Sequence, residues 1–293
     1  MKKLYILAGL VVGLLCVTSC DDYLDRTPDD KTTEQQVFTR YDKVESLVTD
    51  LYAHAKYAQH PLIYFNHFGL SSISDECSAS SHEGAIPHQF HTGNYGPSQG
   101  MPSGSSAGQY WDDLYSTIRS SNIILEEIAK YNTPDNPQDG RTGDLKRRIG
   151  EVYFLRGYLH LLLIRSYGEA VYVNRVINPG DDMTFEKESF HSMVEKICAD
   201  ADSAYNRVDS WNGGQYLGRV DKGACLGLKA MARWLAATPL WNGGNLPNDN
   251  RIFKSEYGYD QKRWELARDA AKAVLECTKE DGSLRYKLYE TYT

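Results

Sequence analysis

The sequence has no excess of positive charge and few cysteines. Its 293 residues include 32 Lys and Arg against 39 Asp and Glu, which gives a formal net charge of −7 at pH 7. A chain of this charge argues against binding to nucleic acid and to anionic lipid headgroups. None of the six cysteines forms a C-x-x-C pair, so the sequence offers no cysteine-ligated zinc site, and we expect no metal.

Sequence motifs of the common enzyme classes are also missing. The chain has no Walker loop, no G-x-S-x-G element and no dinucleotide-binding fingerprint. Adjacent acidic residues such as Glu126 and Glu127 do not fix the separation between two carboxylates that a glycosidase requires. We therefore expect neither catalysis nor a cofactor.

The only long apolar run covers residues 4–17, directly after Lys2 and Lys3. It is shorter than the roughly 20 apolar residues of a membrane-spanning helix, so residues 1–19 are predicted to be a secretory signal peptide. Residues 17–20 (VTSC) resemble the lipobox of bacterial lipoproteins. The resemblance implies that Cys20 is the first residue of the mature chain and carries acyl chains that anchor it in a membrane. The alternative is a secreted protein in which Cys20 is free.

The remaining cysteines apart from Cys16 are far apart in the sequence: Cys77, Cys198, Cys225 and Cys277. We expect buried free thiols. A disulfide is permitted outside the cytoplasm, but the spacing does not select a pair.

Helical periodicity dominates the rest of the chain. Residues 20–33 are acidic and polar and contain Pro28, as expected of a tether. Apolar residues at steps of three and four then predict helices over residues 34–57, 109–131, 144–167, 190–205, 222–240 and 261–278. Gly168 is placed to end the third of these helices. Because no strand pattern is comparably strong, we predict an all-α domain over residues 34–293, an α-solenoid of TPR-like helix pairs with long irregular loops.

Residues 71–108 stand apart because they are rich in Ser, Gly, Pro and His. A connection of this length is usually functional or disordered. Flat aromatic rings and hydrogen-bonding side chains suit a sugar, so we select Asp75, Glu76, Asn94 and Tyr95 as candidate ligand contacts. Asp75 and Glu76 fit the cap of a helix or turn equally well. The loop also holds His82, His88 and His91, whose spacing matches no helical metal-ligand pair.

Three tryptophans are predicted to have different roles, and one of them is a further candidate ligand contact. The tetrapeptide WNGG occurs at residues 211–214 and 241–244. We interpret Trp241 as a structural anchor at the end of a helix. Trp211 is a candidate exposed aromatic contact for ligand, with packing beside its turn as the alternative. Trp111 falls on the apolar face of its helix and is expected in the core.

Several segments together resemble the SusD/RagB family of outer-membrane nutrient-binding lipoproteins. They include CDDYLD from residue 20, WDDLY from residue 111, GEVYFLRG from residue 150, GRVDKGA from residue 218, ATPLWNGG from residue 237 and WELA from residue 264. The resemblance implies a lipoprotein anchored through Cys20 in the outer membrane and facing the cell exterior. It also implies capture of oligosaccharides, or sometimes peptides, as a lid on a SusC-like TonB-dependent transporter.

The sequence departs from the family pattern in two places. After Gly168 the family usually continues with a polar residue and a proline, whereas this chain reads EAVY. Members of the family also usually run much further than residue 293. We therefore expect the chain to represent the N-terminal part of a family member, without the C-terminal half and with apolar surface exposed.

Three other functions remain open at this point. The chain could capture peptides instead of sugars, or be a surface glycoside hydrolase, although no suitable acid pair is present. It could also be a helical adaptor that holds a transporter without contacting nutrient.

Overall fold

The computed structural model describes residues 33–59, 74–76, 86–94, 109–131, 141–211, 213–246 and 249–288, and these residues are mainly α-helical. The α-helices are α3 (Glu34–Phe38), α4 (Tyr41–Gln59), α6 (Ile86–His91), α7 (Gln109–Tyr131), α8 (Thr142–Tyr167), α9 (Phe190–Tyr205), α10 (Lys222–Ala237) and α11 (Gln261–Leu275). Two short 3-10 helices are η3 (Gly214–Tyr216) and η4 (Lys254–Glu256). The described residues contain no strand beyond two isolated bridges, so the all-α prediction is confirmed.

The observed helix boundaries agree with those predicted from the sequence at several ends and differ at others. The first predicted helix is divided into α3 and α4 at Thr39 and Arg40. The helix predicted to reach residue 240 ends at Ala237, because Thr238 is extended before Pro239, as residues that precede proline prefer to be. The short helix α6, within the predicted loop, was not expected from the sequence.

Side-chain caps define where three of the helices begin. Ser189, Asp221 and Asp260 each accept a hydrogen bond from a backbone N–H in the first turn of α9, α10 and α11, respectively. At the other end of α8, Gly168 has a φ of +73° and donates its N–H to the carbonyl of Ile164 at 2.9 Å. This left-handed conformation favours glycine and confirms the predicted end of the helix.

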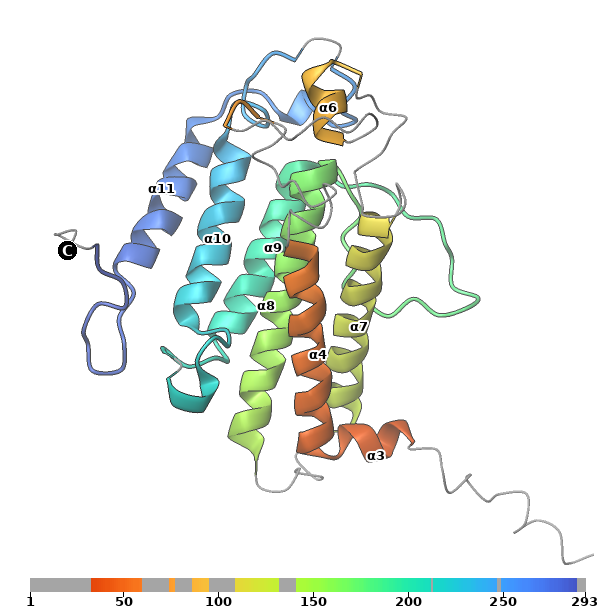
Figure 1. Ribbon diagram of the computed structural model, residues 1–293, viewed down its shortest axis with the longest axis vertical. Coiled ribbons are helices and arrows are strands. Elements are labelled where there is room, and N and C mark those ends of the chain that lie inside the picture. The colour runs from red at the N-terminus through yellow and green to blue at the C-terminus, as the bar shows by residue number, and fades with distance from the viewer. Residues whose placement is uncertain are drawn as a thin grey trace, which may run out of the picture. The chain divides into compact units, whose positions relative to one another are not determined.

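The long helices α4, α7, α8, α9, α10 and α11 stack in the order of the sequence. Helix α8 packs against α4, α7, α9 and α10, and α10 in turn packs against α9 and α11. Figure 1 shows that successive long helices run in opposite directions, which gives the pairs α4/α7, α8/α9 and α10/α11. This arrangement confirms the predicted TPR-like helix pairs.

Helix α8 is the centre of this stack. Leu159, Leu161, Leu163 and Ile164 are all at most 1% exposed, although they point in different directions around the helix. A helix that is apolar on all sides is one surrounded by other elements. Its contact with the end of α9 is close, because a Cβ added at Gly150 would lie only 2.8 Å from side-chain atoms of Arg207 and Val208, just beyond that helix.

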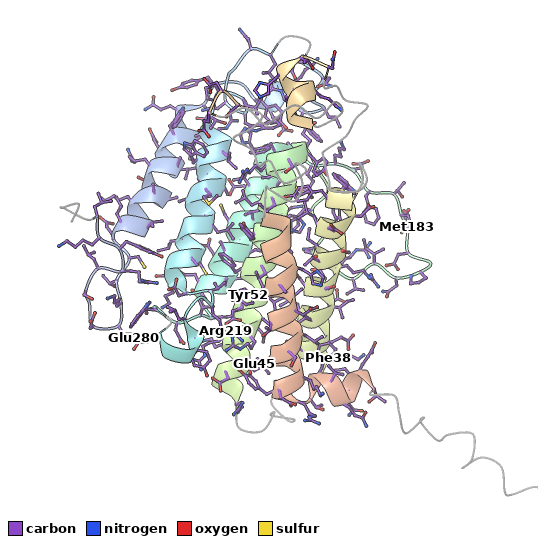
Figure 2. The ribbon with its side chains drawn as sticks, in the orientation of Figure 1. Phe38, Glu45, Tyr52, Met183, Arg219 and Glu280 are labelled. Atoms are coloured by element: carbon purple, nitrogen blue, oxygen red, sulfur yellow. The ribbon has the colours of Figure 1, made fainter. Side chains whose placement is uncertain are left out.

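A network of charges and hydroxyls joins α4, α8 and the start of α10. The guanidinium of Arg219 donates to Glu151 at 2.9 Å and to Glu45 at 3.3 Å, and the N–H of Val220 donates to the hydroxyl of Tyr52 at 3.0 Å. Figure 2 shows Arg219 beside α4, next to Glu45 and Tyr52. Burial is the main reason that the pKa of Tyr52 is raised, so this hydroxyl stays protonated as a structural partner.

The connection from α8 to α9 is fastened to α7. The side-chain amide of Asn122 donates to the carbonyls of Val173 and Arg175, both at 3.1 Å. Ala170 and Glu188 pair as an antiparallel bridge that closes the base of the loop. The residues that depart from the family pattern after Gly168 therefore have a defined conformation.

Trp241 is an anchor, as predicted. Its ring stacks on Phe190 with centroids 4.1 Å apart, and Tyr257 meets it edge-on at 5.1 Å. A Cβ at Gly168 would approach this ring to 3.0 Å, which gives a second reason for glycine at that position. The predicted core residue Trp111 is half-buried and packs edge-on against Tyr167.

Contacts divide the chain after Val37, and the helices from α4 onward all lie in the second unit.

Cys198, Cys225 and Cys277 are buried free thiols, as expected, whereas Cys77 lies outside the described residues. Of the helices in the described ranges, none combines the length and the apolar character needed to cross a membrane.

Candidate functional site

The structure does not bring the sequence-predicted ligand residues together. Asp75 and Glu76 are exposed in a short described segment, where the N–H of Glu76 donates to the hydroxyl of Ser74 at 3.3 Å. Asn94 is exposed just beyond α6, and its side-chain amide donates to Thr92 at 3.2 Å. Tyr95 lies outside the described residues, as does Cys20.

The histidines of the same loop form no metal site that the structure describes. His91 is exposed on α6, and His82 lies outside the described residues. Within the described ranges, no three His, Cys, Asp or Glu side chains are grouped to hold a metal ion.

Trp211 is exposed in the segment between α9 and η3. Its side chain is 44% exposed, which agrees with the prediction of an accessible aromatic ring. Lys279 and Arg285, from the segment after α11, place their cationic groups over this ring at 5.2 and 5.8 Å from its centroid. Two positive charges therefore lie against the Trp211 ring, while the residue remains partly accessible to solvent.

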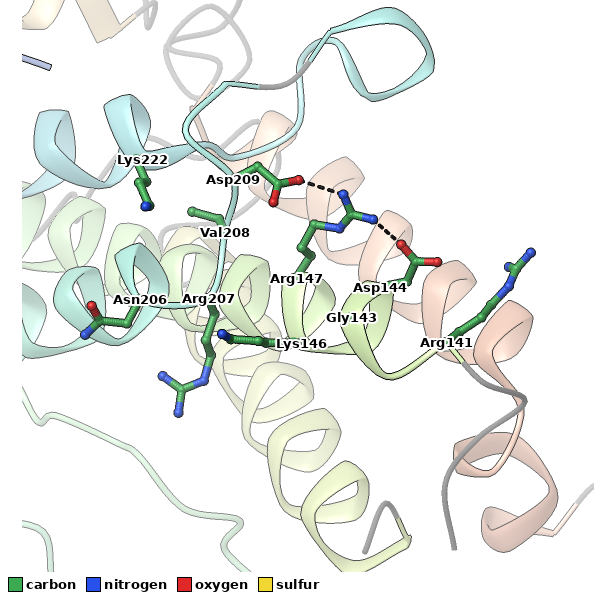
Figure 3. A pocket seen from close by; sticks show the side chains of 10 residues that line it. All are labelled: Arg141, Gly143, Asp144, Lys146, Arg147, Asn206, Arg207, Val208, Asp209 and Lys222. Atoms are coloured by element: carbon green, nitrogen blue, oxygen red, sulfur yellow. Dashed lines mark hydrogen bonds and ion pairs between the residues drawn. The ribbon is translucent and has the colours of Figure 1, made fainter. Parts of the chain in front are cut away.

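A polar pocket of about 550 Å³ opens beside this segment, where α8 begins, α9 ends and α10 begins (Figure 3). The start of α8 contributes Arg141, Asp144, Lys146 and Arg147. The end of α9 and the start of α10 contribute Asn206, Arg207, Asp209 and Lys222. The lining therefore has five cationic side chains and two carboxylates, in a chain that is negative overall.

Both carboxylates of the pocket are held by a single arginine. Arg147 donates to Asp209 at 2.6 Å and also to Asp144, one turn earlier on α8. Figure 3 shows the guanidinium between the two acids. These hydrogen bonds, that to Asp209 foremost, raise the pKa of Arg147 above its ordinary value. The acids are thereby engaged, while the other cations of the pocket have no carboxylate partner within the described residues.

Aromatic rings position three of those other cations. Arg207 lies over the ring of Tyr153 at 5.1 Å and also donates to the carbonyl of Ser203 at 2.7 Å. Lys222 lies over Tyr205 at 5.2 Å, and Arg141 lies over Tyr41 at 4.9 Å. Such contacts hold the cationic groups in place without neutralising their charge.

The pocket and Trp211 are close in the chain. Trp211 follows Asp209 by two residues, so their Cα atoms are at most about 7 Å apart. The N–H of Lys222 donates to the carbonyl of Asp209 at 2.9 Å, which holds this segment against the start of α10. We define the exposed Trp211 ring and this pocket, which are neighbours in the chain, as one candidate site and call it the Trp211 site.

A second exposed surface is different in chemistry. A groove of about 430 Å³ between α10 and α11 is lined by Met231, Trp234, Trp264 and several alanines. Trp234 is 57% exposed and Trp264 is 41% exposed. Its only charged lining residue is Arg268, so the groove offers few partners for sugar hydroxyls.

Trp211 could be selected from the sequence, whereas the pocket next to it could not. Lys146 and Arg147 lie within a basic run at the start of a predicted helix, and Arg207 lies directly after the end of another. These were the available signals. These signals do not reveal that α8 packs on α9, and it is this packing that brings residues some sixty positions apart into one pocket.

Comparison with known proteins identifies the scaffold. Residues 22–231 match the SusD-like family described as starch-binding and associating with the outer membrane. No curated protein sequence matches the chain. Proteins of this family are binding proteins and not enzymes.

Solved structures show the same fold. A SusD homologue from Bacteroides thetaiotaomicron is 21% identical, with a TM-score of 0.61 over 87% of this chain and 43% of that one. A SusD-like protein from Bacteroides fragilis is 19% identical, with a TM-score of 0.57 over 87% of this chain and 41% of that one. A laminarin-binding SusD-like protein is 17% identical, with a TM-score of 0.54 over 69% of this chain and 41% of that one.

The chain thus spans about two fifths of the length of these structures. The family match reaches from residue 22 into α10 and includes α4, α7, α8 and α9, the helices around which the stack is built. The sequence resemblance and the fold lead to the same assignment: the chain belongs to the SusD-like family of binding proteins that associate with the outer membrane.

Proposed function

We propose that this protein captures oligosaccharides at the cell surface and delivers them to a SusC-like TonB-dependent transporter in the outer membrane. The observation that carries the proposal is the Trp211 site, an exposed aromatic ring beside a pocket of hydrogen-bonding side chains on a SusD-like scaffold. The laminarin-binding relative, which has a similar fold, supports a sugar as the ligand.

The chemistry of the Trp211 site suits a sugar. A pyranose ring has apolar C–H faces that stack on an indole and hydroxyls that need donors and acceptors. Trp211 supplies the flat surface, while Asn206 and Lys222 supply polar groups at the pocket. The apolar groove at Trp234 offers aromatic surface for stacking but few hydrogen-bonding side chains, so it is the weaker candidate for a sugar site.

The same proposal covers the parts of the chain outside the described residues. Residues 1–19 act as the signal peptide, Cys20 carries the acyl chains, and residues 20–33 tether the helical domain over 34–293. Two or more acyl chains hold a protein firmly at a membrane, since each buried CH₂ adds about 0.8 kcal/mol. The protein would then be anchored in the outer membrane and face the exterior, where it meets both nutrient and transporter.

A binding screen with a matched pair of variants tests this function. The full chain in detergent is titrated with oligosaccharides of several classes and with peptides, and calorimetry measures the affinity for each. Trp211→Ala should weaken sugar binding by up to about tenfold, since stacking on an aromatic ring contributes about 0.5–1.5 kcal/mol. Trp234→Ala removes a tryptophan that is even more exposed and should leave the affinity unchanged.

Each other result has a defined meaning for the proposal. Peptide binding without sugar binding would replace the proposed nutrient class. Equal loss in both tryptophan variants would place the sugar elsewhere. Partner binding to a transporter with no nutrient affinity would indicate a structural adaptor.

A further inference from the structure

We propose that the Trp211 site selects anionic oligosaccharides, whose carboxylate or sulfate groups enter the pocket between α8, α9 and α10. This inference rests on the proposed function and names the substrate class. Its first support is the charge of the pocket, where five cations meet two carboxylates and both carboxylates are already bound by Arg147. Four cations are therefore left for a ligand.

Two of these cations extend from neighbouring positions, on α8 and just beyond α9. A Cβ at Gly150 would lie 2.8 Å from Cβ of Arg207, so this face of α8 looks directly onto Arg207. Lys146 lies one helical turn earlier on the same face. Figure 3 shows the side chains of Lys146 and Arg207 next to each other. Like charges in one pocket raise its free energy when it is empty, and an anion bound among them reduces that repulsion.

Two of the cations, Arg207 and Lys222, are also held in place before a ligand arrives. Arg207 is held by Tyr153 and by the carbonyl of Ser203, and Lys222 is held over Tyr205. Preorganised charges lose little side-chain entropy on binding, which improves affinity for a group of matching charge. A neutral sugar would leave the repulsion in place.

Positive charge extends from the pocket to the aromatic ring. Lys279 and Arg285 lie over Trp211. Arg285 also pairs with Asp221 at 3.1 Å, immediately before Lys222 of the pocket. Because Arg285 is already paired, a saccharide at Trp211 would meet the charge of Lys279 at the ring and the four cations of the pocket. The indole favours a saccharide over an acidic peptide as the carrier of the negative groups, because peptides lack the flat C–H face of a pyranose.

The test measures how tightly the full chain in detergent binds three saccharides of equal length. They are tetragalacturonate, a sulfated galactose tetramer and neutral galactotetraose. At least one anionic tetramer should bind about tenfold more tightly than the neutral one, a difference of about 1.4 kcal/mol. Rising NaCl concentration should weaken this binding, because the cations of the pocket are partly exposed to solvent. Inorganic sulfate should compete with it more strongly than chloride of equal ionic strength.

Two variants locate the effect. Lys146→Gln with Lys222→Gln should remove most of the preference for the anionic tetramer, whereas Lys254→Gln, an exposed lysine of η4, should keep it. Lys146→Glu alone provides a second variant if the double change reduces the thermal stability.

The outcomes separate this inference from the function on which it rests. Neutral galactotetraose that binds as tightly as both anionic tetramers, with dependence on Trp211, would overturn the anionic selectivity and leave sugar capture intact. An unchanged anionic preference in the lysine variants would place the anion at another site and overturn the inference. An oligoglutamate that binds more tightly than all three saccharides would overturn both, as would an absence of binding to any saccharide class.

Discussion

Arg156 of α8 and Asp200 of α9 form a two-point ion pair inside the helical stack. The Nε atom of Arg156 lies 2.9 Å from one carboxylate oxygen, and an Nη atom lies 2.5 Å from the other. The residues are only 7% and 4% exposed. Asn122 and the hydroxyl of Tyr172 complete the hydrogen bonding of the pair, at 3.0 and 2.6 Å. The pair therefore ties together α7, α8, α9 and the loop between α8 and α9.

Asp200→Ala should destabilise the protein by about 3–5 kcal/mol, because it leaves the Arg156 guanidinium buried without its counter-charge. Chemical denaturation followed by circular dichroism measures the loss. Glu195→Ala, also on α9, removes the exposed carboxylate that pairs with Arg233 and should cost at most about 1 kcal/mol. Equal losses in the two variants would contradict the special role of the buried pair.

Gly150→Ala should destabilise the α8/α9 contact by about 1–3 kcal/mol, since the new methyl group would overlap Arg207 and Val208. Gly227→Ala in α10 is the matched control. Among the described residues, no atom outside the adjoining helix backbone lies within 4 Å of a Cβ at that position, so the change should stabilise the helix by about 0.5–1 kcal/mol. Opposite signs in thermal unfolding are the expected result, and the same sign in both would show that close packing is not what requires Gly150.

His160 should make stability fall in mild acid. Complete burial lowers its pKa to about 3, and its neutral ring accepts a hydrogen bond from the N–H of Val173 at 3.1 Å. Below about pH 6.5 the unfolded chain takes up a proton that the folded chain does not, so the free energy of unfolding decreases as pH falls. Above that pH the histidine is neutral in both states and has no such effect.

The measurement compares the wild-type protein with His160→Gln at several pH values between about 7.5 and 5. The wild-type advantage in unfolding free energy should shrink by about 1.4 kcal/mol for each pH unit below 6.5. A difference that does not change with pH would show that the folded state also binds the proton.

The groove between α10 and α11 should bind hydrophobic molecules. Replacing Trp234 and Trp264 together by Ser should lower the fluorescence of a bound hydrophobic dye and reduce self-association, because both rings contribute to an exposed apolar surface. The cost in stability should be smaller than that of Trp241→Ala, which removes a buried ring and should cost about 3–5 kcal/mol. Unchanged dye binding in the double variant would assign the dye to another surface.

Much of the fold could be predicted because the information is local. The periodicity of residues 109–131 and 190–205 predicted α7 and α9 with the observed bounds, and Gly168 marked the end of α8. The role of Trp241 was also predictable, since it follows a helix and lies next to a turn signal. Helix α6 was missed because six residues provide too little periodicity to distinguish a helix from a loop.

The candidate site was predictable only in part. Trp211 could be selected as an exposed ring beside an Asn-Gly turn. Its cationic neighbours Lys279 and Arg285 lie about seventy residues away in the sequence, and no local pattern connects them to it. Tyr95 and Cys20 remain predictions, and Asp75, Glu76 and Asn94 are described as exposed without any contact that tests their role.

The central position of α8 has a consequence for how the molecule opens. Because four helices cover α8, its amide protons at Leu159 and Leu163 can exchange with solvent only when the whole stack comes apart. Helix α11 packs chiefly against α10 and can detach at a much lower free energy. Native-state hydrogen exchange should therefore fall into at least two classes, with α11 exchanging first, and the groove at Trp234 would exist only while α11 stays docked.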